Sequence, residues 1–421
     1  MLGLGPKLTA RLTELGLTDP TPIQAQAIPH AMNGRDVMGL AQTGTGKTAA
    51  FALPLIHALT AAGAKPAPKG AHALILAPTR ELAGQIAETI NDLTKGGHLR
   101  VQIVTGGKPI GGQVQRLARG TDVLVATPGR LIDLMDRRAV DLSHARFLVL
   151  DEADQMLDLG FIHALRRIAP ALPADRQTML FSATMPKQMA EIAAAYLRSP
   201  VRVEVAPPGK AADKVEQEVH FVEGAEKQER LIDLLDGHRD DLALVFGRTK
   251  HGSEKLMKKL VAAGFAAASI HGNKSQGQRD RALRAFKEGE VRVLVATDVA
   301  ARGIDIPGVG YVYNYELPNV PENYVHRIGR TARAGRDGIA VALCAPDEMG
   351  ELRAIEKAMG ARIPVASGTP FAEAAAPTKG RGGRGGKPGG GRGAGAGAGG
   401  GAGARGARSG GRKRRGPRRA A

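Results

Sequence analysis

The sequence predicts two tandem α/β domains, each built on a parallel sheet, followed by a tail without a packed core. Three observations indicate this. Short apolar runs alternate with longer helical stretches, a proline- and glycine-containing break separates two sets of such runs, and apolar periodicity is lost from Thr378 onward. A strand buried on both faces of a parallel sheet reads as an unbroken apolar run. A helical stretch between two such strands favours a right-handed crossover.

The first set of runs predicts the strands of an N-terminal domain over residues 1–204. These runs are Asp36–Ala41, Ala73–Ala77, Val101–Thr105, Val123–Ala126, Phe147–Leu150 and Thr178–Phe181. The next segment, Val205–Asp213, contains two prolines and a glycine. These residues exclude a helix or a central strand, so the segment is predicted to be an interdomain linker.

The pattern resumes over residues 214–365, which predicts a second α/β domain of similar size. Its apolar runs are Leu242–Phe246, Ala267–Ile270, Val291–Ala296, Tyr311–Asn314 and Ile339–Cys344. Ligands of parallel sheets bind beyond the carboxyl ends of the strands. We therefore expect functional residues immediately after these runs in both domains.

Residues 366–421 are predicted to form a disordered basic tail. The chain has a formal net charge of +18, and thirteen Lys or Arg with no Asp or Glu occur from Lys379 to the end, which leaves +5 for the rest. A segment of Gly, Arg, Ala and Lys cannot bury enough apolar surface to offset chain entropy. Without aromatic residues after Phe371, the tail would hold nucleic-acid phosphates without stacking on bases. The alternative is a solubilising extension without a ligand.

Composition excludes several other classes of protein. The single cysteine, Cys344, rules out a framework of intrachain disulfides and suits a reducing compartment. No window of 18 uncharged apolar residues occurs, so no membrane span is expected. The first residues, Met1–Thr9, lack the pattern of a secretory signal. The predicted location is the cytoplasm.

A phosphate-binding loop is predicted where the first apolar run meets a helix. The segment reads Ala41-Gln42-Thr43-Gly44-Thr45-Gly46-Lys47-Thr48. A glycine-rich turn ahead of a helix directs several backbone N–H groups at phosphate oxygens. Lys47 would add a charge at the β/γ-phosphates, and Thr48 a hydroxyl ligand for Mg²⁺. Ala41 stands where the strict pattern has glycine, so a chance glycine turn is the alternative.

A second signal follows the run Phe147–Leu150, which ends in Asp151-Glu152-Ala153-Asp154. Burying carboxylates at a strand end is costly unless a cation is present. In a phosphate-loop fold an Asp on a neighbouring strand holds Mg²⁺, which is the role expected of Asp151. Glu152 is then placed to orient or deprotonate the attacking water. The alternative for either motif alone is a solvated acidic turn.

These residues and a series of further motifs resemble the DEAD-box family of superfamily 2 helicases, and the bacterial RhlE-like subgroup in particular. The resemblance covers roughly Leu4 to Pro364 and rests on about a dozen motifs in the family's order. Besides the phosphate loop and the DEAD residues, the motifs are Gly16–Gln24, Pro78–Leu82, Gly106-Gly107, Thr127–Arg130, Ser182-Ala183-Thr184, Val245–Lys250, His271-Gly272 with Gln276 and Arg279, Ala296–Asp305 and His326–Arg333.

The resemblance implies two tandem RecA-like domains of the P-loop NTPase fold that bind ATP and Mg²⁺. The implied nucleotide-binding residues are Leu17, Gln24, Thr43, Gly44, Thr45, Gly46, Lys47, Thr48 and Asp305, and the implied catalytic residues are Lys47, Asp151, Glu152, Arg330 and Arg333. Gln24 would read the adenine edge, and Arg330 and Arg333 match the family's arginine fingers. Leu17 stands where the family usually has an aromatic residue, so we expect weaker adenine selectivity.

The resemblance also implies that RNA binds across both domains. The implied RNA contacts are Thr79, Arg80, Gly107, Thr127, Arg130, Thr249, Gln276, Arg279 and Thr297. Ser182 and Thr184 would couple the ATP state to domain closure. The predicted activity is RNA-dependent ATP hydrolysis that unwinds short RNA duplexes or remodels ribonucleoprotein, in ribosome assembly or RNA turnover. Two alternatives stay open, an ATP-gated RNA clamp and a DNA helicase; ribosomal particles or RNA-decay proteins are possible partners of a monomeric core.

Overall fold

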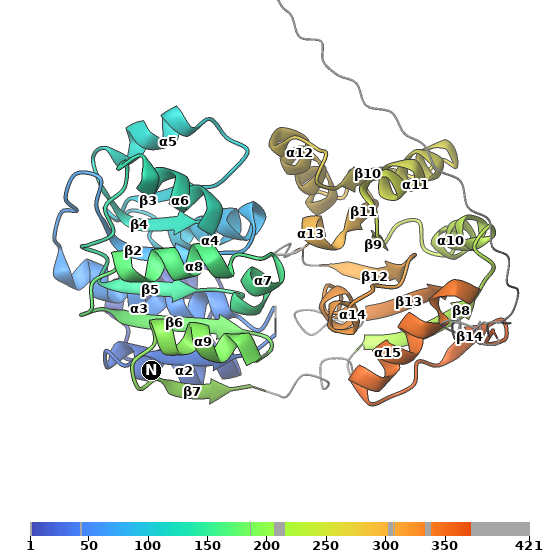
Figure 1. Ribbon diagram of the computed structural model, residues 1–421, viewed down its shortest axis with the longest axis horizontal. Coiled ribbons are helices and arrows are strands. Elements are labelled where there is room, and N and C mark those ends of the chain that lie inside the picture. Colours follow the sequence, from blue (N-terminus) through green and yellow to red (C-terminus); the bar gives the residue numbers. More distant parts are fainter. Residues whose placement is uncertain are drawn as a thin grey trace, which may run out of the picture. The chain divides into compact units, whose positions relative to one another are not determined.

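The computed structural model describes residues 2–42, 44–185, 187–205, 215–301, 306, 308–332 and 338–371. Within these residues the chain forms two α/β lobes, one before and one after the predicted linker in the sequence (Figure 1). The predicted linker beyond Val205, and the predicted tail beyond Phe371, lie outside the described residues.

The N-terminal lobe contains seven strands and nine α-helices among the described residues. In chain order they are α1 Pro6–Glu14, α2 Pro22–Met32, β1 Val37–Leu40, α3 Lys47–Ala62, β2 Ala71–Leu76, α4 Arg80–Leu93, β3 Val101–Val104, α5 Ile110–Leu117, β4 Thr121–Ala126, α6 Pro128–Asp136, β5 Phe147–Leu150, α7 Ala153–Asp158, α8 Ile162–Ile168, η1 Ala169–Ala171, β6 Gln177–Ser182, α9 Lys187–Tyr196 and β7 Val201–Glu204. The strands form one parallel sheet in the order β3-β4-β2-β5-β6-β1-β7.

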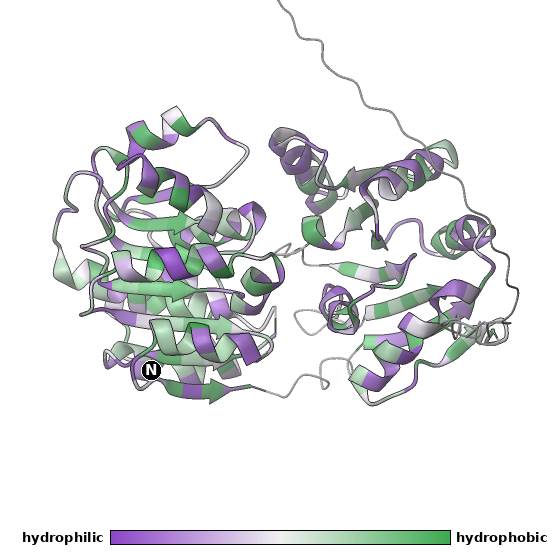
Figure 2. Cartoon of the chain, in the orientation of Figure 1, coloured by the Kyte–Doolittle hydropathy of each residue, from purple (hydrophilic) through white to green (hydrophobic). Residues whose placement is uncertain are grey.

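Two apolar cores cover the two faces of this sheet, because successive strand residues point to opposite sides. One face packs against α2, α3 and α4 through residues such as Val125 and Phe181. The other packs against α6 to α9 through residues such as Leu124 and Leu180. Figure 2 shows the result as hydrophobic strands beneath helices that carry polar residues. The central strands are therefore apolar on both faces, as predicted.

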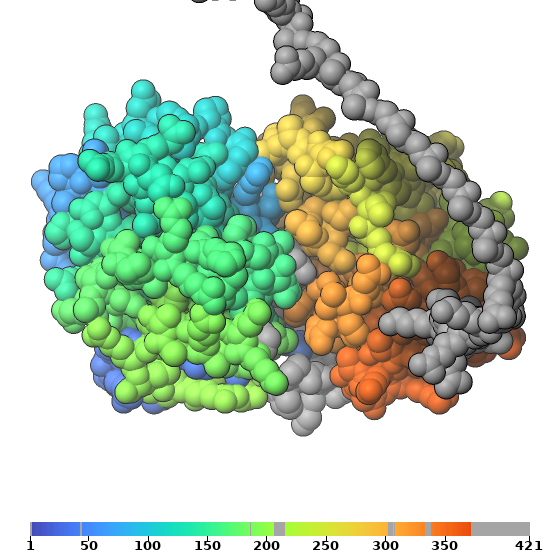
Figure 3. All heavy atoms as spheres, in the orientation of Figure 1, coloured from blue at the N-terminus to red at the C-terminus, as the bar shows by residue number. Residues whose placement is uncertain are grey.

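The C-terminal lobe repeats this plan. The colours of Figure 3 show that it is formed by its own segment of the chain. Its elements are β8 Val215–Phe221, α10 Lys227–Asp236, β9 Leu242–Gly247, α11 Lys250–Ala262, β10 Ala267–Ile270, α12 Gln276–Lys287, β11 Val293–Thr297, α13 Asp298–Ala301, β12 Val309–Asn314, α14 Pro321–Ile328, β13 Gly338–Cys344, η3 Pro346–Glu348, α15 Met349–Met359 and β14 Val365–Ser367. The sheet is parallel, in the order β10-β11-β9-β12-β13-β8-β14. Helices α10 and α11 pack on one face, and α12 to α15 on the other.

Three strands were not predicted: β7, β8 and β14. Strand β7 alternates polar and apolar residues, β8 is interrupted by Glu216, Gln217 and Glu218, and β14 is only three residues long. Strands β7 and β14 are edge strands. An edge strand is half-exposed, so it lacks the unbroken apolar run that marked the central strands. Strand β14 pairs with β8 and extends the C-terminal sheet two residues beyond residue 365, where the end of the domain was predicted.

No helix among the described residues is long and apolar enough to cross a membrane.

Candidate active site and nucleic-acid interface

The order of strands in the N-terminal sheet gathers the predicted nucleotide motifs. The phosphate loop follows β1, the DEAD residues follow β5, and Ser182-Ala183-Thr184 lies at the end of β6. These three strands are neighbours in the order β5-β6-β1. All run parallel, so their carboxyl ends meet at one edge of the sheet. The structure thus brings three motifs, spread over more than 130 residues of sequence, to one place.

The phosphate loop depends on its glycines. Gly44 and Gly46 have φ angles of 81° and 89°, which residues with a side chain rarely adopt. A Cβ atom on Gly46 would also lie 2.5 Å from Nε2 of Gln24. Thr45 closes the turn by donating its hydroxyl to the carbonyl of Gln42 at 2.8 Å, and α3 then begins at Lys47. The loop therefore has the strand-turn-helix context that a phosphate site requires.

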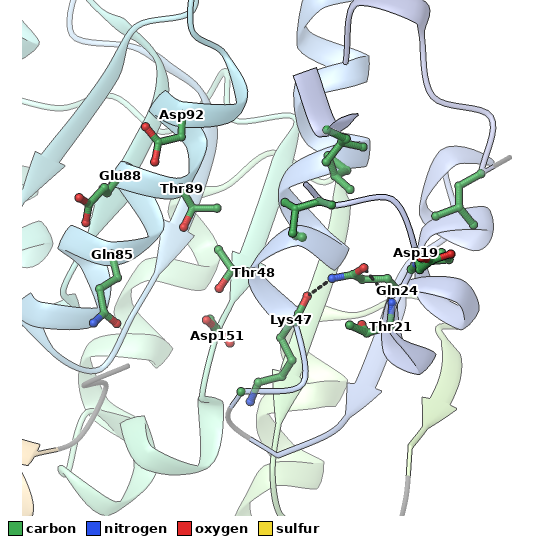
Figure 4. Close-up of a pocket in the computed structure, with 18 of the residues that line it drawn as sticks. Asp19, Thr21, Gln24, Lys47, Thr48, Gln85, Glu88, Thr89, Asp92 and Asp151 are labelled. Carbon is green, nitrogen blue, oxygen red and sulfur yellow. Dashed lines mark hydrogen bonds between the residues drawn. The ribbon is translucent and has the colours of Figure 1, made fainter. Parts of the chain in front are cut away.

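Gln24 connects helix α2 to the phosphate loop. Its Nε2 donates to the carbonyl oxygen of Gly46 at 3.0 Å, and its Oε1 accepts from the backbone N–H of Thr21 at 3.0 Å (Figure 4). A primary amide can donate twice and accept twice. One donor and one acceptor position of Gln24 thus remain for a nucleobase edge while the loop contact is kept.

Lys47 is a buried cation that suits an anionic ligand. Its side chain is 5% exposed, and its Nζ has no hydrogen-bond partner among the described residues. Oε2 of buried Glu152 also has no such partner. Both residues line a cavity of about 970 Å³. Figure 4 shows Lys47 in this cavity with Thr48 and Asp151, which also line it. Unpartnered buried charges are costly, so the cavity is suited to a phosphate chain with a divalent cation.

Glu152 has an unusual backbone geometry beside Asp151. Glu152 has φ 51° and ψ 51°, a left-handed conformation that is uncommon without glycine, and its N–H donates to Oδ1 of Asp151 at 3.0 Å. Burial raises the pKa of Glu152 to about 7, opposed by Lys47 and Arg330 and assisted by Asp151. Burial also raises the pKa of Asp151, against the effect of Lys47. A cation beside Asp151 would favour its charged form.

Asp154 links the DEAD residues to the predicted coupling motif. Its Oδ2 accepts from the N–H of Ala183 at 3.0 Å, from the N–H of Thr184 at 2.8 Å and from the Thr184 hydroxyl at 3.0 Å. Ser182 in turn donates its hydroxyl to the carbonyl of Thr184 at 2.7 Å. From the sequence, Asp154 was recognised as part of the Asp151–Asp154 motif, but no role was predicted for it. This bonding partner could not be read from the sequence.

Arg327 of α14 and Arg330 in the turn after it have different surroundings. Arg327 is 2% exposed and forms a bidentate pair with Asp298, with Nε–Oδ1 at 2.5 Å and Nη2–Oδ2 at 2.8 Å. It also donates to Asn314 and to the carbonyl of Glu316. Arg330 instead lines the cavity of Lys47 and Glu152. Arg327 is therefore an internal link of the lobe. Arg330 donates its Nε to the carbonyl of His326 at 3.3 Å, and its role at the nucleotide stays a prediction.

Beyond the phosphate loop the cavity continues between α1 and α4. Its lining includes Leu4, Leu12 and Leu17, and Glu88 and Asp92 of α4. Leu17 is 53% exposed. A flat base placed here would be covered by an aliphatic side chain, without the stacking that an aromatic ring provides.

The predicted RNA contacts of the N-terminal lobe follow the other half of its sheet, β3-β4-β2. Thr79 and Thr127 are the N-cap residues of α4 and α6. Arg80 lies against Gly107, where a Cβ atom would stand 2.1 Å from Nη1 of Arg80, and Gly107 has φ 78°. Arg130 donates to the carbonyl of Lys108 at 3.0 Å. The structure thus gathers hydroxyl, guanidinium and glycine groups beside the nucleotide site.

The C-terminal lobe places its predicted RNA contacts in the matching half of its sheet, after β10, β11 and β9. Thr249 is the exposed N-cap residue of α11, and Thr297 ends β11 opposite Gly247 of β9. Gln276 begins α12, one turn before Arg279. Gln276 accepts from Arg80 at 3.1 Å, and Arg279 lies 3.2 Å from the carboxylate of Glu81.

Three predicted site residues lie outside the described residues: Thr43, Asp305 and Arg333. Their roles stay predictions from the resemblance. No group of three or more His, Cys, Asp or Glu able to hold a metal ion occurs in the described part of the chain. Thr48 and Asp151 both line the cavity, so they are the residues that would hold a Mg²⁺ ion together with phosphate oxygens.

Two tandem RecA-like lobes with a phosphate loop, a buried acidic pair and an arginine in the same cavity define a nucleoside-triphosphate hydrolase. Comparison with known proteins narrows this class. A family model described as DEAD/DEAH box helicase matches residues 21–192, and one described as helicase conserved C-terminal domain matches residues 226–335. The chain belongs to the DEAD-box family of ATP-dependent RNA helicases.

Individual relatives agree with this assignment. The ATP-dependent RNA helicase CshA of Listeria monocytogenes is 45% identical over 361 residues, which are 86% of this chain and 68% of CshA. The structure of S. cerevisiae Dbp5 bound to RNA and ADP BeF3 is 32% identical with a TM-score of 0.76, covering 87% of this chain and 94% of that chain. Mss116p bound to ssRNA and AMP-PNP is 27% identical with a TM-score of 0.79, covering 87% and 78%. The RhlE-like subgroup stays a prediction.

Proposed function

We propose that this helicase uses the residues gathered at its strand ends to couple ATP hydrolysis to the local separation of short RNA duplexes. The observation that supports this most directly is that nucleotide motifs and predicted RNA contacts follow different strands of the same sheet. In the N-terminal lobe the nucleotide motifs follow β5, β6 and β1, and the predicted RNA contacts follow β3, β4 and β2. Two ligands can therefore occupy neighbouring parts of one sheet edge without competing.

At the nucleotide site, each of the buried charged residues has a separate role in hydrolysis. Lys47 binds the β- and γ-phosphates, and Glu152 orients or deprotonates the attacking water. Arg330, with Arg333, stabilises the charge that develops on the γ-phosphoryl group. An arginine finger accelerates hydrolysis by about 10³–10⁵, which is roughly 4–7 kcal/mol of barrier. Thr48 and Asp151 would hold Mg²⁺, which neutralises phosphate charge when bound.

On the RNA side, the residues are of the kind that contact the backbone of a strand. Hydroxyls, glycine N–H groups and isolated arginines bind sugar and phosphate and do not read base sequence. Contacts to 2′-hydroxyl groups would give a preference for RNA over DNA. Dbp5 and Mss116p, which share this fold, were both determined with RNA. We infer that a strand bent by this surface no longer fits an A-form duplex, so the partner strand leaves.

The link between the two sides is the Asp154 bridge. Asp154 follows the catalytic Glu152 and holds Thr184, and Ser182 holds the same turn. A conformational change at Asp151 or Glu152 can thus be transmitted to the Ser182–Thr184 turn through Asp154, in the first turn of α7. The basic tail would add sequence-independent affinity for RNA or ribosomal particles. Ribosome assembly and RNA turnover are the processes we propose, for a core that acts as a monomer.

The proposal is tested with Glu152→Gln in the full chain. Glutamine keeps the shape and volume of the side chain but cannot accept a proton. We expect binding of ATP and single-stranded RNA to persist while RNA-stimulated turnover falls by about 10²–10⁴. Asp175→Asn, at a carboxylate that is 98% exposed, is the control and should leave turnover unchanged.

Two further measurements separate the alternatives. Equal stimulation of ATP hydrolysis by single-stranded DNA and RNA would support a DNA helicase. Stable ATP-dependent RNA binding without strand separation, measured with a fluorescent short duplex, would support an RNA clamp. Truncation after Ala376 should weaken RNA binding at low salt and leave turnover at saturating RNA unchanged, and a large fall in that turnover would argue against a tethering tail.

A further inference from the structure

The loop between β10 and α12 prepares two of the proposed RNA contacts. It runs from His271 to Ser275, and Gln276 and Arg279 follow in the first turn of α12. The loop has little packing of its own. Gly272, Asn273 and Ser275 are exposed, and a Cβ atom on Gly272 would meet nothing within 4 Å. Its conformation must therefore be maintained by polar contacts.

One carboxylate supplies these contacts at both ends of the loop. Oε2 of Glu254, on helix α11, accepts from the hydroxyl of Ser269 at 2.6 Å and from Nζ of Lys274 at 2.8 Å. It also lies 3.0 Å from Nε2 of His271. Ser269 belongs to β10, His271 begins the loop and Lys274 stands near its end. Glu254 thus spans the loop from the strand to the helix start.

The backbone of the loop is compatible with this restraint. The N–H of Lys274 donates to the carbonyl of His271 at 3.0 Å, which closes a turn between the two residues that contact Glu254. Ser275 then caps α12, with its N–H donating to Oε1 of Gln278 at 2.9 Å and its hydroxyl accepting from the N–H of Gln278. The direction in which α12 starts is therefore set by the turn that Glu254 holds.

Glu254 lies on the helix that begins at another proposed RNA contact. Helix α11 is capped by Thr249, whose side chain accepts from the N–H of Gly252 at 3.0 Å. Glu254 follows five residues later. The hydrogen bonds from Lys274 and Ser269 lower the pKa of Glu254 to about 2, so the carboxylate is ionised at every working pH. Bonds from a cation to a carboxylate are among the stronger ones available to a protein.

We propose that Glu254 is a positioning residue for RNA, which holds the loop His271–Ser275 so that Gln276 and Arg279 lie in register with Thr249 on the RNA-binding edge of the C-terminal lobe. The inference rests on the proposed function, because these three residues are its proposed RNA contacts. Glu254 itself touches none of the reacting atoms. Its effect is therefore expected in the affinity for RNA, not in the chemical step.

The experiment compares Glu254→Ala and Lys274→Met in the full chain, by ATP hydrolysis titrated with a single-stranded RNA. We expect Glu254→Ala to raise the KM for RNA about tenfold, as for the loss of a charge-assisted bond. The kcat at saturating RNA and the KM for ATP should not change. Glu290→Gln removes the same charge from an exposed position just after α12 and serves as the matched control.

A double variant separates positioning from direct binding by Lys274. If Glu254 acts through Lys274, the double variant should raise the KM for RNA no further than the single variants. If the increases in the KM for RNA are additive, Lys274 binds RNA independently of Glu254. If Glu254→Ala lowers the KM for RNA, Glu254 restrains Lys274 from binding RNA. Either result overturns the proposal. So would a Glu254→Ala protein indistinguishable from Glu290→Gln, or one that loses kcat and ATP affinity together.

Failure of the inference can be told from failure of the proposed function. If hydrolysis by the unaltered protein is not stimulated by RNA, the proposed function and the inference fail together. If the unaltered protein is stimulated and only the Glu254 variants behave like the control, the inference alone fails. Circular dichroism of each variant confirms that the lobe is folded before kinetics are compared.

Discussion

Leu17 shows how one side chain can set the selectivity of the nucleotide cavity. It lines the cavity at the expected adenine position and is 53% exposed. We predict that Leu17→Tyr lowers the KM for ATP several-fold, because an aromatic ring adds about 0.5–1.5 kcal/mol to stacking. Titration of hydrolysis with ATP and with UTP measures this. ATP should gain more than UTP, and an equal gain would mean that the ring adds only buried area.

Glu254 gives a pH dependence whose sign follows from its pKa. The folded pKa is about 2, against an ordinary value of 4.5, because Lys274 and Ser269 donate to the carboxylate. A depressed folded pKa adds stability that is fully present above the unfolded value and is lost as pH falls towards the folded one. We predict that the difference in unfolding free energy between the unaltered protein and Glu254→Gln is constant at about pH 6–7 and shrinks below about pH 4.5. Urea titrations at several pH values measure this difference, which would stay constant if the carboxylate made no such bonds.

Elements of the C-terminal lobe are joined by a buried carboxylate, Glu348 of η3. It is 2% exposed and pairs with Lys227 of α10 and with Arg248 of the β9–α11 connection. It also accepts from the N–H groups of Leu317 and Ala345, each at 3.1 Å. One side chain thus connects segments that are up to 121 residues apart in sequence.

The Glu348 junction leads to a stability prediction. Glu348→Gln would leave Lys227, which is 4% exposed, without a paired charge. Breaking a buried pair in this way costs about 3–5 kcal/mol. Urea unfolding of the C-terminal lobe should show that loss. Glu351→Gln, whose carboxylate is 25% exposed and lies 3.7 Å from Arg248, should cost less than about 1 kcal/mol. Similar losses for the two variants would contradict the prediction.

The central strands were predictable because a strand buried on both faces is an unbroken run of apolar residues in the sequence. Phe147–Leu150 was predicted to the residue, since it is apolar on both faces. Ala267–Ile270 was also predicted to the residue, although it is an edge strand and contains Ser269. Strand β8 was not, because Glu216, Gln217 and Glu218 interrupt it. In the site, the phosphate loop and acidic motif were recognisable from local spacing. Asp154 and Glu254 were not assigned roles, because their partners lie 30 and 15–20 positions away and only the fold brings them into contact.

Strand order also determines how each lobe can be divided. In the N-terminal sheet β1 lies between β6 and β7, with Val37 opposite Met179 on one side and Val201 on the other. We predict that a fragment ending at residue 205 unfolds cooperatively in urea, whereas one ending at residue 175 shows no cooperative transition. The shorter fragment lacks both neighbours of β1 and exposes the apolar face of α2 and α3. A cooperative transition in both would mean that β2 to β5 form an independent unit.

The same strand order has a consequence for the protein while it is being synthesised. Asp36, just before β1, accepts a hydrogen bond from Thr178 of β6, which follows 142 positions later. At about 5–20 residues per second, the ribosome needs on the order of ten seconds to supply that partner. Throughout this interval the first apolar strand has no permanent neighbour. The nascent chain is therefore expected to be a client of chaperones that shield apolar segments as they leave the ribosome.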